Sequence, residues 1–368
     1  MGKSSYEPFS IMEALSEIGI SYNPNGVTKN QRVKCPKCGH IDFYVDVTRN
    51  IGHCYRSTCG YKCNQISLVA DHYGVSGKEA IAMMLGKKAS GKVQSYTPPT
   101  VHESEPIADI EKLNTVYKSF YTAYSLSDRH KKDLQNRGLT QEEIKRLPYF
   151  SYEKDESFAR RLYKELKSVS GIPGLYMSPD GADMQNIKGI FVPYFDSKRR
   201  IQGFQCRYNE EDRKVISGKK QAKYGWFSTN GYDHGTKATA VIHYAFDWSI
   251  DLYGNYSPIY SKEVYLTEGA MKADIIHLIS GINLIAVPGV NCLGQLPSVL
   301  SDLKAHGVQT IINAYDMDYI NNPDVADACN KAANLIKGHG FKYKRAAWDI
   351  EKGKGLDDFM AAKRKEQK

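Results

Sequence analysis

The sequence predicts a multidomain α+β protein with three structured parts: a small β-rich, cysteine-rich module, a mixed α+β region with basic strands, and an α/β region with a parallel sheet. Three observations support this prediction. Five of the eight cysteines lie within residues 35–63, residues 190–230 alternate in the manner of strands, and strands and helices alternate from residue 263 onward. With 368 residues, of which 41% are hydrophobic, the chain is long enough for two or three compact domains.

Composition along the chain predicts where these parts begin and end. We expect the cysteine-rich module in residues 1–87 and a flexible linker in residues 88–107, where Ser, Thr and Pro are frequent and apolar periodicity is missing. Residues 108–258 are expected to form helices followed by basic strands, and residues 259–368 the α/β region. The linker would allow the first module to move relative to the rest.

The α/β region shows the clearest periodicity. Because the carboxyl ends of parallel strands meet at one edge of a sheet, the loops that follow these strands are expected to build a site. The expected strands are Val264–Thr267, Leu284–Val287, Thr310–Tyr315 and Lys342–Ala347, and the expected helices are Ala270–Ser280, Leu296–His306 and Pro323–Gly338.

Charge and hydropathy exclude several classes of protein. The formal net charge of +9 fits a polyanionic partner such as nucleic acid, although solubility alone would also explain it. No stretch approaches the roughly 18 consecutive apolar residues of a membrane helix, and the first residues lack the apolar core of a signal peptide. We therefore expect a cytoplasmic protein without a membrane partner. The phosphate-binding motif Gly-x4-Gly-Lys-Ser/Thr of helicase motors is absent from the sequence.

The cysteine spacing predicts one structural zinc ion. Two short cysteine pairs, C-x2-C and C-x4-C, are separated by fifteen residues, and two such pairs on tight turns can close a tetrahedral site of four thiolates. The expected ligands are Cys35, Cys38, Cys54 and Cys59. The fourth ligand stays open, because the second gap is longer than usual and other donors lie nearby: Cys63, His40 and His53.

Basic and aromatic residues alternate around these cysteines, which is typical of surfaces that bind single-stranded nucleic acid, since basic groups follow phosphates and aromatic faces stack on unpaired bases. Alternatively, half or more of the aromatic residues cover the small core of the module. The residues are Arg32, Lys34, Lys37, Arg49, Arg56 and Lys62, with Phe43, Tyr44, Tyr55 and Tyr61.

Three acidic motifs follow expected strands of the α/β region. They carry Glu268, then Asp316 and Asp318, then Asp357 and Asp358. On a continuing strand Asp316 and Asp318 would share a face. Clustered carboxylates repel one another unless a cation holds them, and Mg²⁺ or Mn²⁺ with oxygen ligands is the usual arrangement for phosphoryl transfer. We expect one or more catalytic divalent ions here. The expected catalytic residues are Glu268, Asp316, Asp318 and Asp357, and Asp358 is expected as a further ligand. Glu268 could alternatively act as a general base.

Together the three motifs resemble the Toprim domain that primases, topoisomerases and some nucleases share. The cysteine module resembles the zinc-binding domain of bacterial and phage primases. The order of zinc ribbon, linker, helical and basic region, and Toprim domain resembles that of the DnaG-type primases over nearly the whole chain. The resemblance implies that residues 108–258 are the basic subdomain of a primase core and that residues 259–368 are its catalytic Toprim subdomain.

The resemblance also implies nucleotide- and template-binding residues. In this family an Arg and a Lys of the basic strands contact the template or the incoming nucleotide, and the matching positions are Arg207 and Lys223, with Tyr224 beside them. Two positions depart from the family pattern. Lys272 stands where a further Asp is frequent, which makes it a candidate phosphate ligand, and Gly355 stands where another Asp can occur.

These features imply a DNA primase that makes short RNA primers on single-stranded DNA from nucleoside triphosphates. No helicase domain follows Asp358, so the resemblance implies a separate replicative helicase as partner and a phage or other mobile element in a bacterial host cell as the source. A Toprim nuclease with the same metal site is the main alternative. A non-catalytic adaptor that binds single-stranded DNA and recruits a helicase is the other.

Overall fold

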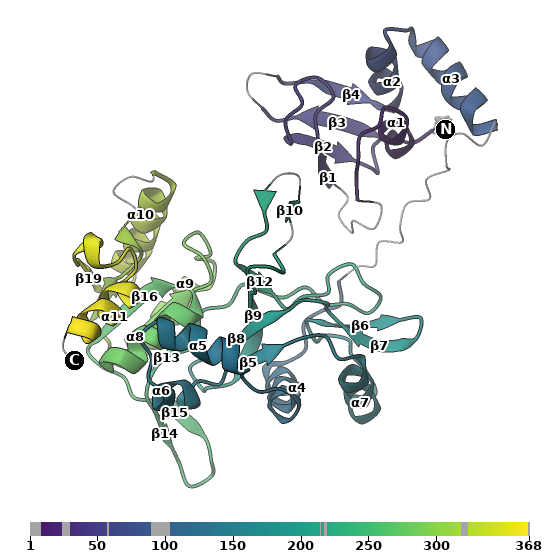
Figure 1. The fold of residues 1–368 in the computed structure, drawn as a ribbon. Coiled ribbons are helices and arrows are strands. Elements are labelled where there is room, and N and C mark those ends of the chain that lie inside the picture. Colours follow the sequence, from purple (N-terminus) through teal and green to yellow (C-terminus); the bar gives the residue numbers. More distant parts are fainter. Residues whose placement is uncertain are drawn as a thin grey trace. The chain divides into compact units, whose positions relative to one another are not determined.

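The structure is a computed structural model that describes residues 9–23, 30–56, 59–89, 104–213, 215–216, 219–317 and 323–366 (Figure 1). The chain divides into two compact units, and each is described by itself. The first, here called the N-terminal unit, comprises residues 1–103 and 214–221; the second, the core unit, comprises residues 104–213 and 222–368. Among the described helices, none combines the length and the apolar character needed to cross a membrane.

The N-terminal unit is a four-stranded antiparallel sheet with three helices, as expected for a β-rich module. The strands follow one another in the order β1-β2-β3-β4. Ser10 and Glu13 form a capping box at the start of the first helix, and Asn64 caps the second. The elements are α1 (Ile11–Glu17), β1 (Asn30–Val33), β2 (Phe43–Asp46), β3 (Ile51–Cys54), β4 (Lys62–Asn64), α2 (Gln65–Tyr73) and α3 (Gly77–Ala89), and the short pair β10 (Val215–Ile216) and β11 (Lys219–Lys220) completes the unit.

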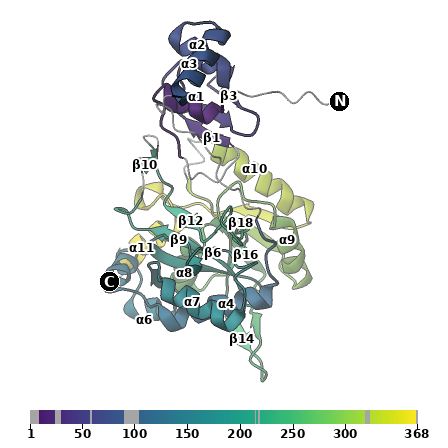
Figure 2. The same cartoon turned by 90° about the vertical axis from the view of Figure 1, so that its right-hand side faces the viewer.

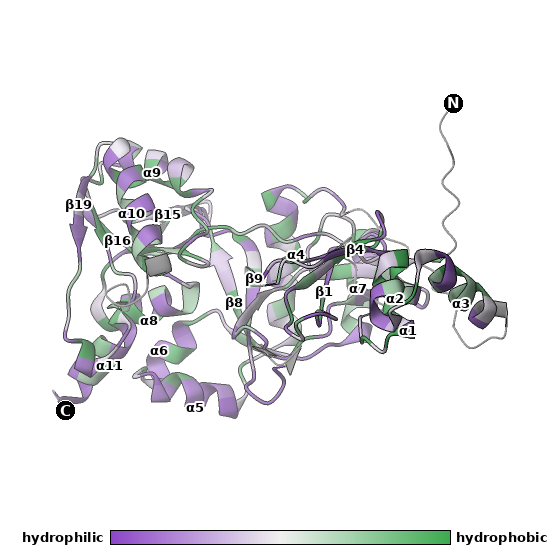
Figure 3. Ribbon diagram, turned by 90° about the horizontal axis from the view of Figure 1, so that it is seen from above, coloured by the Kyte–Doolittle hydropathy of each residue, from purple (hydrophilic) through white to green (hydrophobic). Residues whose placement is uncertain are grey.

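The first half of the core unit is built on an antiparallel sheet of order β12-β9-β8-β5. Helices α4 and α7 pack on it through an aromatic core that includes Phe120, Phe158 and Phe204. Helix α5 is mostly hydrophilic (Figure 3) and buries only His130 and Leu134. The elements are α4 (Ile110–Ala123), α5 (Asp128–Asn136), α6 (Gln141–Arg146), β5 (Phe150–Tyr152), α7 (Glu156–Leu166), β6 (Leu175–Ser178), β7 (Gly181–Met184), β8 (Gly189–Phe195), β9 (Ile201–Tyr208) and β12 (Tyr224–Trp226).

The second half of the core unit contains the predicted parallel sheet, so the predicted mixed α+β fold class is confirmed. The strand order is β13-β17-β16-β18-β19; β16–β19 are parallel, and β13 joins the edge in the antiparallel direction. The strands are β13 (His243–Ala245), β16 (Glu263–Glu268), β17 (Leu284–Val287), β18 (Thr310–Asn313) and β19 (Lys342–Arg345), and the helices are α8 (Ala270–Ser280), α9 (Leu296–Ala305), α10 (Pro323–Gly338), η2 (Ile350–Lys352) and α11 (Leu356–Glu366).

Helices cover both faces of this sheet, as the apolar character of its strands requires. One face buries Val264 and Leu266 against α9 and α10, which lie beside β18 in Figure 2. The other face packs against α8 and α11 through residues that include Ala273, Ile276 and Leu356. Strands β14 (Trp248–Ile250) and β15 (Tyr256–Pro258) form a hairpin that projects from the core unit in both Figures 1 and 2.

A further apolar cluster joins the two sheets of the core unit. It contains Ile190 and Val192 of β8, Met271 and Ile275 of α8, and Leu134 of α5. A polar bridge crosses the same junction. The fully buried His243 accepts a hydrogen bond from the Phe195 N–H at 3.0 Å, and its other ring nitrogen lies 2.9 Å from the carboxylate of Asp274, which also accepts one from the Tyr149 hydroxyl at 2.6 Å. These contacts fix the antiparallel sheet relative to the parallel one.

Candidate active site and zinc centre

The four predicted zinc ligands of the N-terminal unit come together in the structure. One sulfur from each lies within 4.8 Å of all the others; the Sγ atoms of Cys35 and Cys59 are 3.9 Å apart, and those of Cys38 and Cys54 are 3.8 Å apart. The two pairs come from the turn before β2 and from the end of β3 with the turn that follows it. Sulfur–sulfur separations of this size fit the tetrahedral four-thiolate site of a single zinc ion.

Cys59, rather than one of the alternative donors, completes the four-sulfur cluster. Cys63 is buried in the core of the unit and lies outside the four-sulfur cluster, and burial raises the pKa of its thiol to about 11. His40 uses its Nδ1 on the backbone carbonyl of Cys38 at 2.8 Å. The ring of His53 packs against that of Tyr55, with ring centroids 4.3 Å apart. The cluster therefore contains Cys59, one of the four expected ligands.

A backbone hydrogen bond favours the thiolate form of one cysteine of this cluster. A hydrogen bond from the backbone N–H of His40 lowers the pKa of Cys38 to about 6, whereas burial raises that of Cys35 to about 12. A thiolate is the form that binds zinc, and the turn after Cys38 favours this form of the Cys38 side chain.

One row of side chains crosses the exposed face of the small sheet. Strand register pairs Arg32 with Tyr44, Tyr44 with His53, and His53 with Lys62, so the four side chains share one face. The opposite face of β2 buries Phe43 and Val45. Tyr44 is 37% exposed and Tyr55, just after β3, is 67% exposed; their rings meet edge to face with centroids 5.1 Å apart. Of the expected aromatic residues, Phe43 thus belongs to the core, and Tyr44 and Tyr55 face solvent.

In the core unit, a pocket of about 540 Å³ brings together residues that the sequence analysis predicted from separate motifs. Acidic residues come from the end of β16 (Glu268), the loop after β18 (Asp316) and the start of α11 (Asp357 and Asp358). Gly269 separates β16 from α8 with a φ of +77°, a conformation that glycine adopts without strain and that allows the helix to begin two residues after Glu268. The carboxyl ends of β16 and β18 therefore form the acidic wall.

The other wall of this pocket is basic and comes from the antiparallel sheet. Arg207 of β9 and Tyr224 of β12 are paired across the two strands, and Lys223 precedes Tyr224. Arg207 lies 3.8 Å from the carboxylate of Asp133. Lys272 of α8 and Lys354 also line the pocket. With Arg137, five basic side chains face four acidic ones, so the pocket suits both a cation and a polyanion.

Ion pairs connect the two sets of charges. The Lys272 ammonium donates a hydrogen bond to Asp316 Oδ1 and lies 3.5 Å from Glu268 Oε1. Burial of Lys272 opposes its charge, but Asp316, Asp357 and Glu268 outweigh that effect and raise its pKa. Lys354 lies 3.8 Å from Asp316 Oδ2.

Asp357 is the most deeply buried carboxylate of the pocket, with 6% of its surface exposed. Burial raises its pKa, although the nearby Lys272 lowers it. Its Oδ2 lies 3.9 Å from an Arg137 nitrogen, and its Oδ1 has no hydrogen-bond partner among the described residues. A buried carboxylate oxygen without a partner is costly and is usually satisfied by a bound ion or water.

The chain leaves the sheet before the second acidic motif, earlier than the sequence predicts. The strand was expected to extend to Tyr315 and to carry Asp316 onward, but β18 ends at Asn313 and Asp316 lies in the following loop. The Asn313 side chain accepts a hydrogen bond from the Tyr315 N–H at 2.9 Å, which turns the backbone out of the sheet. The predicted ligand Asp318 lies outside the described residues.

Sequence analysis missed several residues that line the pocket. Arg137 directly follows α5 and Gln205 lies in β9, and both reach the pocket only through tertiary packing. Lys354 lies in the third acidic motif but was not singled out. Gln205 accepts a hydrogen bond from the buried Tyr194 hydroxyl at 2.8 Å, which fixes its amide. The segment Leu134-Gln135-Asn136-Arg137-Gly138-Leu139 resembles a short helical motif of the DnaG-type primases, and this resemblance could have pointed to Arg137.

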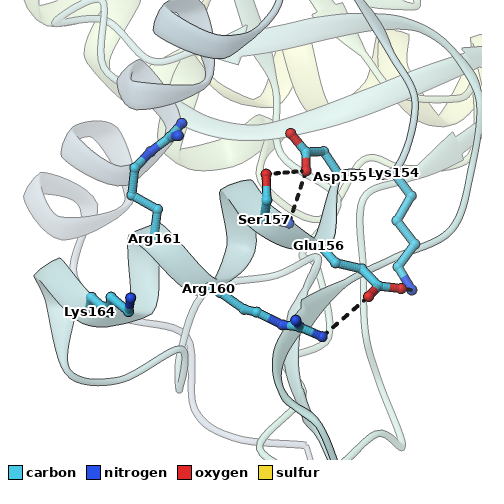
Figure 4. Close-up of a pocket in the computed structure, with 7 residues that line it drawn as sticks. All are labelled: Lys154, Asp155, Glu156, Ser157, Arg160, Arg161 and Lys164. Carbon is cyan, nitrogen blue, oxygen red and sulfur yellow. Dashed lines mark hydrogen bonds and ion pairs between the residues drawn. The ribbon is translucent and has the colours of Figure 1, made fainter.

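A larger, shallow pocket of about 840 Å³ surrounds the start of α7 (Figure 4). Its charges largely pair with one another: Asp155 caps the helix, Lys154 pairs with Asp183 and Glu156, and Arg160 pairs with Glu156. Arg161 and Lys164 extend from the helix in Figure 4. None of the predicted site residues lines this pocket.

Comparisons with known proteins give the following similarities. Residues 259–367 match the family described as "Domain of unknown function (DUF3854)". No curated protein matches the sequence. Among solved structures, the chain is similar to the zinc-binding and RNA polymerase domains of the Aquifex aeolicus primase at 17% identity and a TM-score of 0.48, covering 98% of this chain and 81% of that one.

The RNA polymerase domain of the Mycobacterium tuberculosis primase DnaG is 15% identical, with 70% of this chain and 82% of that chain covered and a TM-score of 0.47. The primase fragment of the bacteriophage T7 primase-helicase protein is 12% identical, with 91% and 96% covered and a TM-score of 0.37. These solved structures are bacterial and phage primases.

Proposed function

We propose that this chain is a DNA primase that makes short RNA primers on single-stranded DNA by metal-dependent nucleotidyl transfer. One observation carries the proposal: the basic residues of one sheet and the carboxylates at the strand ends of another line a single pocket. A pocket that joins phosphate-binding cations to clustered carboxylates is suited to transfer between phosphates. The amino-acid order of zinc cluster, basic strands and acidic motifs supports the same reading.

The residues of the pocket fit a divalent cation such as Mg²⁺ or Mn²⁺. Carboxylates are the ligands that these ions prefer, and the buried Asp357 Oδ1 has no other partner among the described residues. Glu268, Asp316 and Asp357 would hold the ion, with Asp358 and Asp318 as further ligands. When bound, the ion would neutralise charge on the phosphates and on the attacking oxygen.

The remaining side chains would bind and orient the reactants. Arg207 and Lys223 would bind the triphosphate or the template backbone, and Tyr224 would lie beside the nucleotide. The ribonucleotide 3′-hydroxyl attacks the α-phosphate of the next triphosphate, a new phosphodiester bond forms, and pyrophosphate leaves. Glu268 would act either as a metal ligand or as the acceptor of the hydroxyl proton.

The N-terminal unit would contact the DNA template. Its zinc ion would be structural, and the row of Arg32, Tyr44, His53 and Lys62 would bind unpaired bases and phosphates. Residues 88–107 would be the tether between this unit and the core. As a replication protein of a phage or other mobile element, the primase would work with a separate helicase in the bacterial cytoplasm.

Primer synthesis by the full zinc-loaded chain tests the proposal. The assay would use single-stranded DNA of mixed sequence, labelled nucleoside triphosphates, and Mg²⁺ or Mn²⁺, with Asp316→Asn as the matched variant. We expect short RNA from the parent and a loss of about 100-fold or more in the variant. Shortening of an end-labelled template without triphosphates would instead indicate a nuclease. DNA binding without either reaction would indicate an adaptor.

A further inference from the structure

Lys272 occupies the position within the acidic pocket where a cation would be expected. It lies in the first turn of α8, and only 17% of its side chain is exposed. Its ammonium contacts the carboxylates of both Glu268 and Asp316, which come from two different strand ends. An ammonium in contact with two carboxylates already supplies one unit of the positive charge that a metal ion would provide.

Lys354 and Arg137 contact the same carboxylates less closely. Lys354 is 57% exposed and lies 3.8 Å from the second oxygen of Asp316, and Arg137 lies 3.9 Å from Asp357 Oδ2. Lys272 is therefore the basic side chain in closest contact with the acidic wall among the described residues. Asp357 Oδ1 is buried and has no hydrogen-bond partner among the described residues, so it can accept one more cation.

We propose that Lys272 is a built-in cation that takes the place of one divalent ion, so that this pocket binds a single divalent ion with Asp357 among its ligands. The inference rests on the proposed function only in taking the pocket as a divalent-metal site. Lys272 pairs with Glu268 and Asp316, and the buried Asp357 Oδ1 is left to accept one further cation. The ammonium then remains available as a fixed positive charge beside a bound phosphate.

The number of bound Mn²⁺ ions tests this proposal without any activity measurement. The full chain with its zinc in place would be titrated with Mn²⁺, and the free ion followed by electron paramagnetic resonance. We expect one Mn²⁺ for the parent and two for Lys272→Met, because loss of the ammonium frees the carboxylates of Glu268 and Asp316. A parent count other than one, or the same count for both proteins, would overturn the proposal.

Matched variants locate the ions and control for charge. Lys354→Met also removes one positive charge from the pocket but leaves Lys272 in place, so its count should stay at one. Lys272→Arg keeps the charge and should also bind one ion. Asp316→Asn in the Lys272→Met background should lose the second ion. If Lys272→Met does not fold, Lys272→Gln retains a hydrogen-bond donor at this position and carries the same expectation.

The outcomes separate this inference from the proposed function. If the parent binds one Mn²⁺ and Lys272→Met binds two, but the parent makes no RNA, the proposed primase activity is refuted and the role of Lys272 is retained. RNA synthesis by the parent with equal counts would refute the role of Lys272 alone.

Discussion

Arg364 of α11 donates two parallel hydrogen bonds, each 2.7 Å long, to the carboxylate of Glu143 on α6. The same guanidinium reaches the backbone carbonyl of Gly138 at 3.2 Å. Helix α11 begins with Asp357 and Asp358 at the acidic pocket, so this pair holds the far end of the helix that carries two of the candidate metal ligands. Both side chains are mostly buried, which makes the pair stronger than an exposed one.

Replacement of this arginine should lower stability in a pH-dependent way. The Arg364 hydrogen bonds lower the pKa of Glu143 below its ordinary value of 4.5. A carboxylate with a lowered pKa stabilises the fold above its unfolded pKa, and this contribution is lost as the pH falls through the folded pKa. We expect Arg364→Met to lower the free energy of unfolding by about 1.5–3 kcal/mol near neutral pH, and we expect the difference from the parent to shrink below pH 4.5.

Denaturant unfolding of the two proteins across this pH range would measure the effect. Lys363→Met, on the exposed side of the same helix, is the matched control and should change stability little. A difference that is constant with pH would mean that the Glu143 carboxylate is not the partner that matters.

Two neighbouring cysteines, Cys59 inside the zinc cluster and Cys63 outside it, should respond differently to replacement. Cys59→Ser should lose bound zinc and unfold the N-terminal unit, because a small core with a metal site depends on the metal for stability. Cys63→Ser should keep zinc, since Cys63 lies outside the four-sulfur cluster. Zinc released by a thiol reagent and the melting curve of each variant would measure this. Zinc retained in the Cys59 variant and lost in the Cys63 variant would contradict the ligand set.

Some elements of the fold follow from the local sequence, whereas others depend on contacts between distant segments. Strand β17 has the predicted bounds because it is a continuous apolar segment. Helix α8 has them because glycines flank it, Gly269 before its first residue and Gly281, in the left-handed conformation, after its last. Strand β13 has three residues, too few for a periodicity, and it forms only because it pairs with β17 about forty residues later. The acidic motifs are local in sequence, but Arg137 and Gln205 join the pocket through packing that no spacing encodes.

Exposed aromatic side chains on the N-terminal unit should contribute to binding of single-stranded DNA. Tyr55 is 67% exposed beside Tyr44 and His53. A base stacked on such a ring is worth about 1–3 kcal/mol, so Tyr55→Ala should weaken binding by roughly 5- to 150-fold. Tyr163→Ala, which removes an exposed tyrosine from α7 in the core unit, is the control. Fluorescence anisotropy with a labelled oligonucleotide measures both, and equal losses would argue against a stacking site on this unit.

Arg207 should act on the binding of nucleotide or template rather than on folding. It lies on the basic wall of the pocket, where its guanidinium is 3.8 Å from the Asp133 carboxylate. We expect Arg207→Met to raise the KM for nucleoside triphosphates, or the Kd for template, by about tenfold or more, because one charge-assisted phosphate contact is worth roughly 1.5–3 kcal/mol. Lys188→Met, which removes an exposed charge paired with Glu153, should leave both constants unchanged. An unchanged KM and Kd in the Arg207 variant would remove it from the binding site.

Gly355 stands where an aspartate can occur in the family, and it lies directly beside the carboxylates of the pocket. A Cβ atom built at this position would lie 2.4 Å from Asp357 Oδ1, 3.2 Å from Asp316 Oδ1 and 3.5 Å from the Lys272 ammonium. A side chain at this position would therefore require the Asp357 carboxylate to move. We expect Gly355→Ala to push Asp357 from its place and to lower RNA synthesis by about 100-fold, with weaker Mn²⁺ binding.

Gly294→Ala, where a Cβ would meet nothing within 4 Å, is the matched control and should leave both RNA synthesis and Mn²⁺ binding unchanged. Full activity in Gly355→Ala would show that the carboxylate of Asp357 tolerates displacement and is not a required ligand.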